Sequence, residues 1–235
     1  METPMAEERL PFTIKLVQSP AELEKAVFIR HAAYARHVPT FAAQLTEPEA
    51  GDFADGAVVL LAESKLDGSP LGTMRIQSNR FKPLGLEQSI DLPGWLEDTS
   101  LAEATRLGIA EGHTGRVVKT LLFKAFFQYC QKTSVEWMVI TARSPLDRQY
   151  ENLMFDDVYP GRGYIPMKHV GNIPHRVMAF EVGTAEARWA EARHPLFNFI
   201  FRTRHPDIDL SAQAPERRQV VQRSFGAPAR LEAVA

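Results

Sequence analysis

The hydrophobic pattern along the chain predicts alternating strands and helices. Segments in which apolar residues alternate with polar ones, or form short β-rich runs, are expected to be strands. These segments are residues 12–17, 57–63, 71–77, 101–110, 135–142, 164–167 and 175–182. Segments in which apolar residues recur every three or four positions are expected to be helices, and they are residues 20–36, 116–132 and 144–157. The resulting order, β, α, β, β, β, α, β, α, β, β, predicts an α/β sheet with parallel and antiparallel neighbours.

Local signals support the ends and connections of several elements. Ser19, Pro20 and Glu22 offer an N-cap, a first-turn proline and a capping-box acid, and Ser144, Pro145 and Asp147 repeat that pattern for the helix expected at 144–157. An Asp67-Gly68 turn predicts that the strands at 57–63 and 71–77 form a hairpin. Residues 79–99 are expected to be irregular. The polar stretch 38–51 is expected to be a long loop and a candidate lid.

Length and composition restrict the class of protein. The 235 residues suit one main domain, which we assign to residues 1–183, followed by a helical or irregular extension at 184–235 that packs on it. A formal net charge of −2 disfavours nucleic-acid binding. The single cysteine, Cys130, excludes an intramolecular disulfide, and no apolar run approaches the roughly 20 residues that a membrane-spanning helix needs. Since the first residues lack the apolar segment of a secretory signal, we expect a cytoplasmic protein.

One arginine occupies an apolar helix face. Leu23, Val27, Arg30 and Tyr34 follow 4, 3, 4 spacing in the helix expected at 20–36, so they share one side. An unpaired buried guanidinium is strongly unfavourable, and Arg30 must therefore meet a carboxylate, a phosphate or several carbonyl groups. A structural ion pair and a functional site both satisfy this requirement.

Four short motifs follow one another between residues 30 and 106. They are Arg30 with Tyr34, the sequence Asp52-Phe53-Ala54-Asp55, the strand motif Gly72-Thr73-Met74-Arg75, and the strand motif Glu103-Ala104-Thr105-Arg106. In this order they resemble the acyl-homoserine-lactone synthases and N-acyl amino acid synthases of the GNAT superfamily, over about residues 12–182. The resemblance implies a GNAT-like, mainly antiparallel sheet of six to seven strands flanked by helices. It also implies an N-acyltransferase that uses an acyl-phosphopantetheine thioester.

The resemblance assigns roles to individual residues. Catalytic roles are implied for Glu103, as the base that deprotonates the attacking amine, and for Arg75 and Arg106. Substrate binding is implied for Arg30, Tyr34, Asp52 and Asp55. Contact with the thioester and its pantetheine arm is implied for Leu107, Gly108 and Ile109, where the strand is expected to open, and for Gly115 and Arg116 at the following helix.

The geometry of a strand limits these assignments. Residues three apart in a regular strand point to opposite faces, so Glu103 and Arg106 can serve one site only if a bulge lies between them. The alternative for the whole cluster is a buried network of charges that stabilises the fold.

The acyl donor and acceptor are expected to be an acyl carrier protein thioester and an amino acid or similar small amine. The segment 111–116 lacks the glycine-rich loop with which acetyl-CoA enzymes of the superfamily hold pyrophosphate, which favours a carrier protein over CoA. Arg116, Lys119 and Lys124 could receive an acidic carrier. Thr40 and Phe41 stand where homoserine-lactone synthases carry a tryptophan, which disfavours S-adenosylmethionine as the acceptor.

Two other functional classes remain open from the sequence. One is a CoA-dependent acyltransferase acting on a small amine, and the other is a noncatalytic module that binds an acyl ligand or carrier. No metal site and no tightly bound cofactor are expected, since His113, His169 and His175 lack metal-ligand spacing. Tyr150 stands roughly where many GNAT enzymes place an acid for the leaving thiolate, but it is expected to be a core or surface residue. The aromatic run Phe197, Phe199 and Phe201, with Arg202, Arg204, Arg217 and Arg218 after it, could pack over an acyl channel or contact a partner or membrane surface.

Overall fold

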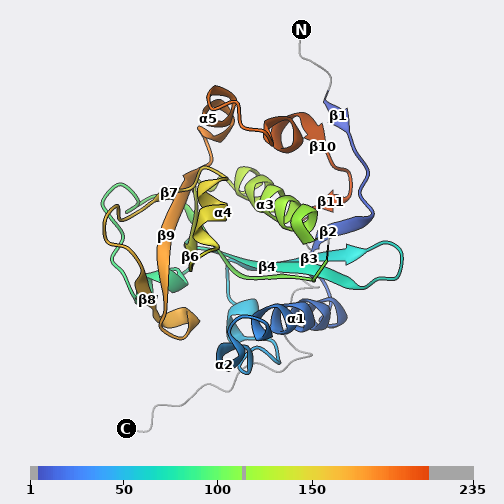
Figure 1. The fold of residues 1–235 in the computed structure, drawn as a ribbon, viewed down its shortest axis with the longest axis horizontal. Coiled ribbons are helices and arrows are strands. Elements are labelled where there is room, and N and C mark those ends of the chain that lie inside the picture. Colours follow the sequence, from blue (N-terminus) through green and yellow to red (C-terminus); the bar gives the residue numbers. More distant parts are fainter. Residues whose placement is uncertain (1–4, 113–114, 212–235) are drawn as a thin grey trace.

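A mixed β-sheet with helices on both faces forms the fold (Figure 1). The computed structural model describes residues 5–112 and 115–211. Six longer strands make up the body of the sheet: β2 (Phe12–Leu16), β3 (Ala57–Ser64), β4 (Pro70–Ser78), β5 (Leu101–Ile109), β6 (Trp137–Ala142) and β9 (Ile173–Glu181). Three short strands extend it to nine: β7 (Asp156–Asp157), β8 (Ile165–Met167) and β11 (Ile208–Asp209). The sequence predicted β8 as the strand at 164–167, whereas β7 and β11 are two residues long, too short to give a periodic signal.

The strand order is β11-β2-β3-β4-β5-β6-β9-β7, with β8 paired to the free part of β9. The pairs β11–β2 and β5–β6 are parallel, and all other pairs in this sheet are antiparallel. The predicted mixed and mainly antiparallel sheet is therefore confirmed, as is the β3–β4 hairpin.

Helices cover the two faces unequally. The α-helices are α1 (Pro20–Ala35), α2 (Pro39–Ala42), α3 (Gly115–Lys132), α4 (Asp147–Glu151) and α5 (Ala185–Glu191), and the shorter helical turns are η1 (Ala50–Asp52), η2 (Gly85–Gln88), η3 (Lys168–Val170) and η4 (Asn198–Arg202). Figure 1 shows α1 and α2 on one face of the sheet and α3 to α5 on the other. The predicted capping box of α1 is confirmed, because Ser19 Oγ accepts from Glu22 N and the Glu22 carboxylate accepts from Ser19 N.

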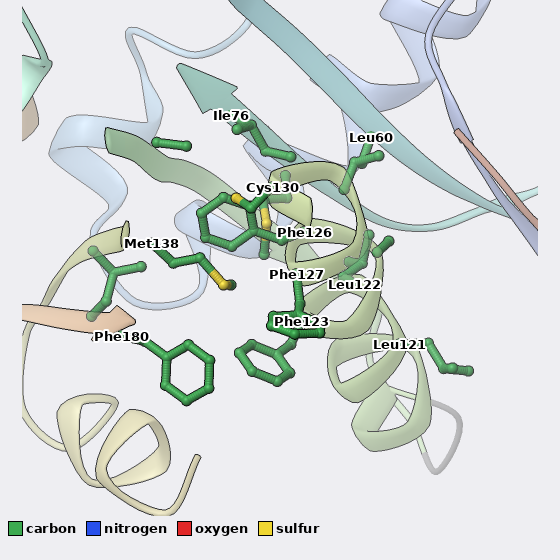
Figure 2. Packing of buried hydrophobic residues seen from close by; sticks show 14 of the residues in the cluster. Leu60, Ile76, Leu121, Leu122, Phe123, Phe126, Phe127, Cys130, Met138 and Phe180 are labelled. Atoms are coloured by element: carbon green, nitrogen blue, oxygen red, sulfur yellow. The ribbon is translucent and has the colours of Figure 1, made fainter. Parts of the chain in front are cut away.

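Alternating residues of the strands supply two separate cores. On β3, Leu60 and Ala62 join the cluster under α3, whereas Val59 and Leu61 contact α1. The cluster under α3 is the larger, and Figure 2 shows Phe123 and Phe127 of that helix beside Phe180 of β9. This period of two explains why the sequence predicted the strands well.

The helix expected at 144–157 is wrong in both of its bounds. The helix begins at Asp147 and ends at Glu151, and Ser144 makes no capping bond. The Asp147 carboxylate instead accepts from Tyr164 Oη at 2.6 Å and Arg176 Nη1 at 3.3 Å, so tertiary partners occupy the expected capping acid. After Met154, whose φ of 65° is left-handed, the chain enters β7.

The stretch expected to be a loose lid is packed into the fold. It contains the short helices α2 and η1, and Phe41 and Leu45 are buried in a cluster with residues of β6 and β9. A lid that opens freely would have to expose both side chains, so this part of the prediction is not supported by the packing.

The segment from Ala185 to residue 211 packs on the sheet and on α3. Its helix α5 buries Ala185 and Trp189, and β10 (Thr203–Arg204) pairs with β1 (Ala6–Glu7). The Phe201 ring contacts the rings of Phe127 and Trp189, so the aromatic run is turned toward the protein core. Arg217 and Arg218 lie outside the described residues. Within residues 5–112 and 115–211, no helix combines the length and the apolar character that crossing a bilayer requires.

Lys124 links α3 to this C-terminal segment, contrary to the docking role expected for it. The side chain is buried, and its ammonium group contacts the carbonyl oxygens of Phe199 and Thr203 and lies 2.9 Å from His205 Nδ1. The helical pattern placed Lys124 off the apolar face, but the C-terminal segment covers that part of α3.

We expect Lys124→Met to lower the free energy of unfolding by about 2 kcal/mol, because two buried carbonyl oxygens lose their donor. Lys132→Met is the matched control, since Lys132 also donates from α3 to a carbonyl of the same segment, that of Leu210, but at the protein surface. Urea denaturation of both variants measures the difference. Equal stability of the two variants would contradict a role for the buried ammonium group.

Candidate active site

The adjacent strands β5 and β6 separate halfway along the sheet. Their pairing runs from Leu101↔Trp137 to Ala104↔Ile140 and stops there, while β4 stays paired with β5 as far as Ile109. On the other side, β6 continues to Ala142 with β9 as its partner. Residues 105–109 of β5 therefore present one edge of backbone N–H and C=O groups that β6 does not pair, at the position where the sequence led us to expect an open strand.

A bulge in β5 brings Glu103 and Arg106 to the same face. Thr73 pairs with Gly108 and Arg75 with Thr105, so two residues of β5 stand opposite one residue of β4. Arg106 has a φ of 56°, as expected at an irregularity of this kind. The Arg106 guanidinium donates to the carbonyl oxygen of His169, and Glu103 Oε1 lies 3.3 Å from Nε2 of the same histidine. The bulge that the sequence required is present.

Three arginines and two carboxylates form a buried network on this face. Arg30 binds Asp52 through two hydrogen bonds of 2.8 and 2.9 Å. Arg106 binds Glu49 through two of 2.6 and 2.7 Å. Arg75 Nη1 lies 3.2 Å from both a Glu49 oxygen and an Asp52 oxygen and joins the two pairs. Three guanidinium groups and two carboxylates leave one positive charge in excess.

Burial and charge oppose each other in this network. Burial alone would raise the pKa of Asp52, but the hydrogen bonds and charge of Arg30 outweigh it, so the net pKa is below its ordinary value. The same balance, with Arg106 as the main partner, lowers the pKa of Glu49. Both carboxylates are therefore ionised at neutral pH.

The sequence identified four members of the network and missed the fifth. Arg30, Asp52, Arg75 and Arg106 come together as the resemblance implied, but Glu49 had been treated as part of a loop. Its spacing, three residues before Asp52 in a 3₁₀ turn, was the available signal, because Asp52 also accepts from Glu49 N. Asp55 does not belong to the network: its side chain is exposed, and only its backbone carbonyl accepts from Gln77.

A cavity of about 360 Å³ occupies the gap between the separated strands. Its walls come from two clusters: Leu107, Ile109 and Tyr150 pack against the cluster under α3, whereas Phe41 belongs to the cluster that includes residues of β6 and β9, and Tyr34 packs against that cluster. The cavity therefore passes through the sheet. Of the predicted thioester contacts, Leu107, Ile109, Gly115 and Arg116 line it; the adjoining residues 113 and 114, His113 included, lie outside the described residues.

The charged side chains among the described residues of the cavity wall are all cationic. The cationic side chains that line it are Arg36, Arg106, Arg116, Lys119 and Arg143. Among the described lining residues there is no Asp or Glu. Burial, and then the charge of Arg116, lower the pKa of Lys119, as expected for a cation without an anionic partner. The cavity is suited to an anionic ligand.

Glu103 lies behind the cavity wall and does not line the cavity. The residue is 1% exposed, its Oε2 accepts from Leu86 N at 3.3 Å, and its Oε1 is turned toward His169. Thr141, which does line the cavity, is 3.4 Å from the same His169 nitrogen. The structure therefore separates Glu103 from any ligand in the cavity by one layer of side chains.

Gly108 has a packing role that the sequence had assigned to ligand contact. A Cβ atom at this position would lie 2.9 Å from Arg30 Cα and 3.0 Å from Ile29 O. The close backbone approach that requires glycine is therefore that of helix α1, and Gly108 is not among the residues that line the cavity.

Tyr150 lines the cavity, at the position where the resemblance allows an acid for the leaving thiolate. Burial, and then the neighbouring Tyr34, raise its pKa well above the ordinary value, so its hydroxyl is protonated at neutral pH. Burial likewise raises the pKa of Tyr34, against the charges of the nearby arginines. Cys130 is buried in the core, and burial raises its pKa.

Sequence comparisons identify no relative: no protein-family model matches the chain, and no curated protein does. Solved structures do match. FeeM, an N-acyl amino acid synthase from uncultured soil microbes, superimposes with a TM-score of 0.61 at 18% identity, covering 77% of this chain and 96% of FeeM. BjaI, a CoA-dependent acyl-homoserine lactone synthase solved with SAM and isopentyl-CoA, gives 0.57 at 13% identity, covering 89% of this chain and 98% of BjaI. The chain thus has the GNAT-like fold of these synthases, which confirms at the level of the fold the resemblance found in its motifs.

Proposed function

We propose that the protein is an N-acyltransferase that moves a fatty acyl group from a carrier thioester to the amine of an amino acid or a similar small molecule. The observation that carries the proposal is the cationic cavity between β5 and β6, which passes through the sheet beside an unpaired strand edge. The fold shared with FeeM and BjaI supports the same reaction class, since both of those proteins are acyl-transferring synthases by name.

The strand edge and the cavity charge fit a pantetheine thioester. A pantetheine arm carries amide groups that can pair with the backbone of residues 105–109, much as an added strand would. Its phosphate would meet Arg116 and Lys119 at the start of α3, where the helix dipole also favours negative charge. The apolar side of the cavity, beside Leu107 and Ile109, would receive the acyl chain.

Acyl transfer forms a C–N bond and breaks the C–S bond of the thioester. The negative charge that develops on the carbonyl oxygen would be stabilised by backbone N–H groups along the open edge of β5. The leaving thiolate needs a proton, and the protonated hydroxyl of Tyr150 on the cavity wall is a suited donor. The buried network holds Arg106 in place through Glu49, so Arg30, Asp52 and Arg75 would position the site and would not contact substrate.

Arg106 provides an argument for the acceptor. It lines the cavity, and its Nη1 atom is a buried donor without a hydrogen-bond partner among the described residues. An amino acid would bring a carboxylate to this side of the cavity, next to Tyr34, and would place its amine toward the thioester.

The test is direct turnover. Purified protein is incubated with a medium- or long-chain acyl carrier protein thioester and a mixture of amino acids, and the products are identified by mass spectrometry. An N-acyl amino acid is the expected product. Absence of amide with both acyl carrier protein and acyl-CoA donors, across the amines tested, would overturn the proposal.

We expect an amino acid to be a better acceptor than its carboxamide by at least about tenfold in kcat/KM, since the carboxamide cannot form a charge-assisted bond to Arg106. The loss should appear mainly in the acceptor KM. The control is the KM of the acyl donor, measured for two donors that carry the same acyl chain. This KM should not depend on which acceptor is used. Equal use of the two acceptors would remove Arg106 as the carboxylate site.

CoA is the second candidate donor, and the cavity wall supplies a specific reason for it. Arg143 adds a further cation near those of α3, which is more positive charge than one phosphodiester requires, whereas Arg36 is paired with Glu111 at 3.3 Å. The segment 111–116 lacks the glycine-rich loop of acetyl-CoA enzymes, which favours the carrier protein. The ratio of kcat/KM for acyl carrier protein and acyl-CoA with one acyl chain decides between them.

A further inference from the structure

The amine that attacks the thioester must lose a proton, and the proposed function leaves the group that accepts it open. Glu103, the acid that the sequence assigned to this role, is sealed behind Leu86 and His169. The described residues that line the cavity contain no carboxylate. The neutral bases among them are the imidazoles of His37, which is exposed to solvent, and of His175, which is buried in the wall.

His175 is such a base by position. It stands near the start of β9, beyond the last pairing of β6 with that strand, at Ala142↔Arg176, and it lines the cavity. Thr141 of β6 and Val170 beside η3 line the same part of the wall. The residue is 8% exposed, so the little surface that it keeps lies at the cavity.

The hydrogen bond of the ring determines which nitrogen can accept a proton. His175 Nδ1 lies 2.7 Å from the carbonyl oxygen of Ile173, and a carbonyl oxygen can only accept, so Nδ1 carries the hydrogen. Nε2 of the neutral ring then has a free lone pair. No hydrogen bond to this atom occurs within the described residues, and it is not among their sealed and unpaired atoms, so it remains open to the cavity.

From this geometry we infer that His175 Nε2 is the proton acceptor in acyl transfer, an inference that rests on the proposed function. The uncharged amine attacks the thioester carbonyl carbon, the C–N bond forms, and one amine proton passes to Nε2. The C–S bond then breaks, and the thiolate takes a proton from the imidazolium, either directly or by way of Tyr150, which the imidazolium then reprotonates. Amine and thioester thus give amide and thiol, with one proton moved from nitrogen to sulfur.

The surroundings of the ring favour the neutral form that this step needs. Burial lowers the pKa of His175, the carbonyl of Ile173 acts in the opposite sense, and the charges of His169 and Arg143 lower it further. The titratable and charged groups that line the cavity with this ring are Tyr34, Arg36, His37, Arg106, Arg116, Lys119, Arg143 and Tyr150, and His169 lies behind the wall; the acids of the neighbouring elements, Glu103 of β5 and Asp147 and Glu151 of α4, do not line the cavity. None of the described groups that line the cavity is an acid that would hold the ring protonated, so the base is ready at neutral pH.

The variant His175→Asn tests the functions of the two ring nitrogens separately. An asparagine amide can still donate to the carbonyl of Ile173, but it offers nothing that accepts a proton from an amine. We expect kcat to fall by about 10²- to 10⁴-fold at neutral pH, with little change in the KM of the donor. His175→Gln is the second variant, and thermal unfolding shows that each variant is folded.

The pH profile distinguishes a base from a structural residue. A protonated imidazole cannot accept the amine proton, so kcat/KM of the wild-type protein should fall on the acid side of pH 6.5, the ordinary pKa of histidine, since the pKa is lowered. This acid limb should be absent in His175→Asn. Glu103→Gln should keep the limb, and His31→Asn, at a histidine outside the cavity, should match the wild type.

Each outcome has one meaning. Loss of the limb in His175→Asn with folded protein and retained donor KM supports the inference. Loss of the limb in Glu103→Gln instead, or unchanged activity of His175→Asn, overturns the inference and leaves the proposed function intact. Absence of amide from the wild-type protein overturns both.

Discussion

Arg30→Leu is expected to lower the free energy of unfolding by about 3–5 kcal/mol and to abolish amide synthesis, because it leaves the buried Asp52 carboxylate without its main partner. The Arg30 and Asp52 side chains are both 0% exposed and share two hydrogen bonds. Removal of the guanidinium forces Asp52 either to remain charged in the core or to take up a proton. Urea denaturation at pH 7 measures the loss, and product formation at a temperature where the variant is still folded measures the second effect.

Arg204→Ala is the matched control for this prediction. Arg204 also pairs with a carboxylate, that of Glu7, but its side chain is 66% exposed. Exposed pairs contribute only about 0–1 kcal/mol, so this variant should unfold close to the wild type. Similar destabilisation by the two substitutions would show that the buried network contributes no more to the free energy of unfolding than an exposed ion pair does.

The pH dependence of the same network follows from its lowered pKa values. The folded protein binds Asp52 and Glu49 as anions, and their pKa values lie below those of the unfolded chain. Their contribution to stability is therefore complete above the unfolded pKa values, near pH 4, and is lost as the pH falls through the folded ones. The difference in stability between the wild type and Arg30→Leu should accordingly shrink in acid.

The sequence predicted that Arg30 needs a buried partner because that signal is local, whereas Asp52, Arg75 and Arg106 came from the resemblance and Glu49 was missed. An arginine in an apolar helix stripe is visible from spacing alone, and burial without a partner is too unfavourable to be tolerated. The bulge in β5 was likewise required by the spacing of Glu103 and Arg106, and it is present. Such features follow from periodicity and from the physics of buried charge.

Features that depend on distant segments could not be predicted in this way. Whether Lys124 is exposed depends on the C-terminal segment that covers it, some 75 residues later in the chain. Asp147 has the spacing of a capping acid, but Tyr164 and Arg176 bind it. His175 belongs to no sequence motif. It is a candidate base because it lines the cavity between the separated strands β5 and β6. In each case the role of the residue depends on a distant segment that the topology of the fold brings beside it.

The role of Gly108 was predicted in part from the sequence and completed by the structure. Its substitution gives the second large effect that we expect. The sequence indicated a close backbone approach at this glycine, and the structure identifies the approaching element as α1. We expect Gly108→Val to lower the free energy of unfolding by about 3 kcal/mol, since the new Cβ would meet backbone atoms of Ile29 and Arg30 that cannot move away individually. Relief of the overlap requires the whole helix to shift.

A shift of α1 away from β5 would also move Arg30 relative to Asp52 and Tyr34 relative to the cavity, so turnover should fall along with stability. Gly94→Val is the matched control, because a Cβ atom at Gly94 would meet nothing within 4 Å. Thermal and urea unfolding of both variants, together with amide formation, measure the two effects. If Gly108→Val were as stable and as active as Gly94→Val, the geometry of the site would not depend on the close packing of α1 against β5.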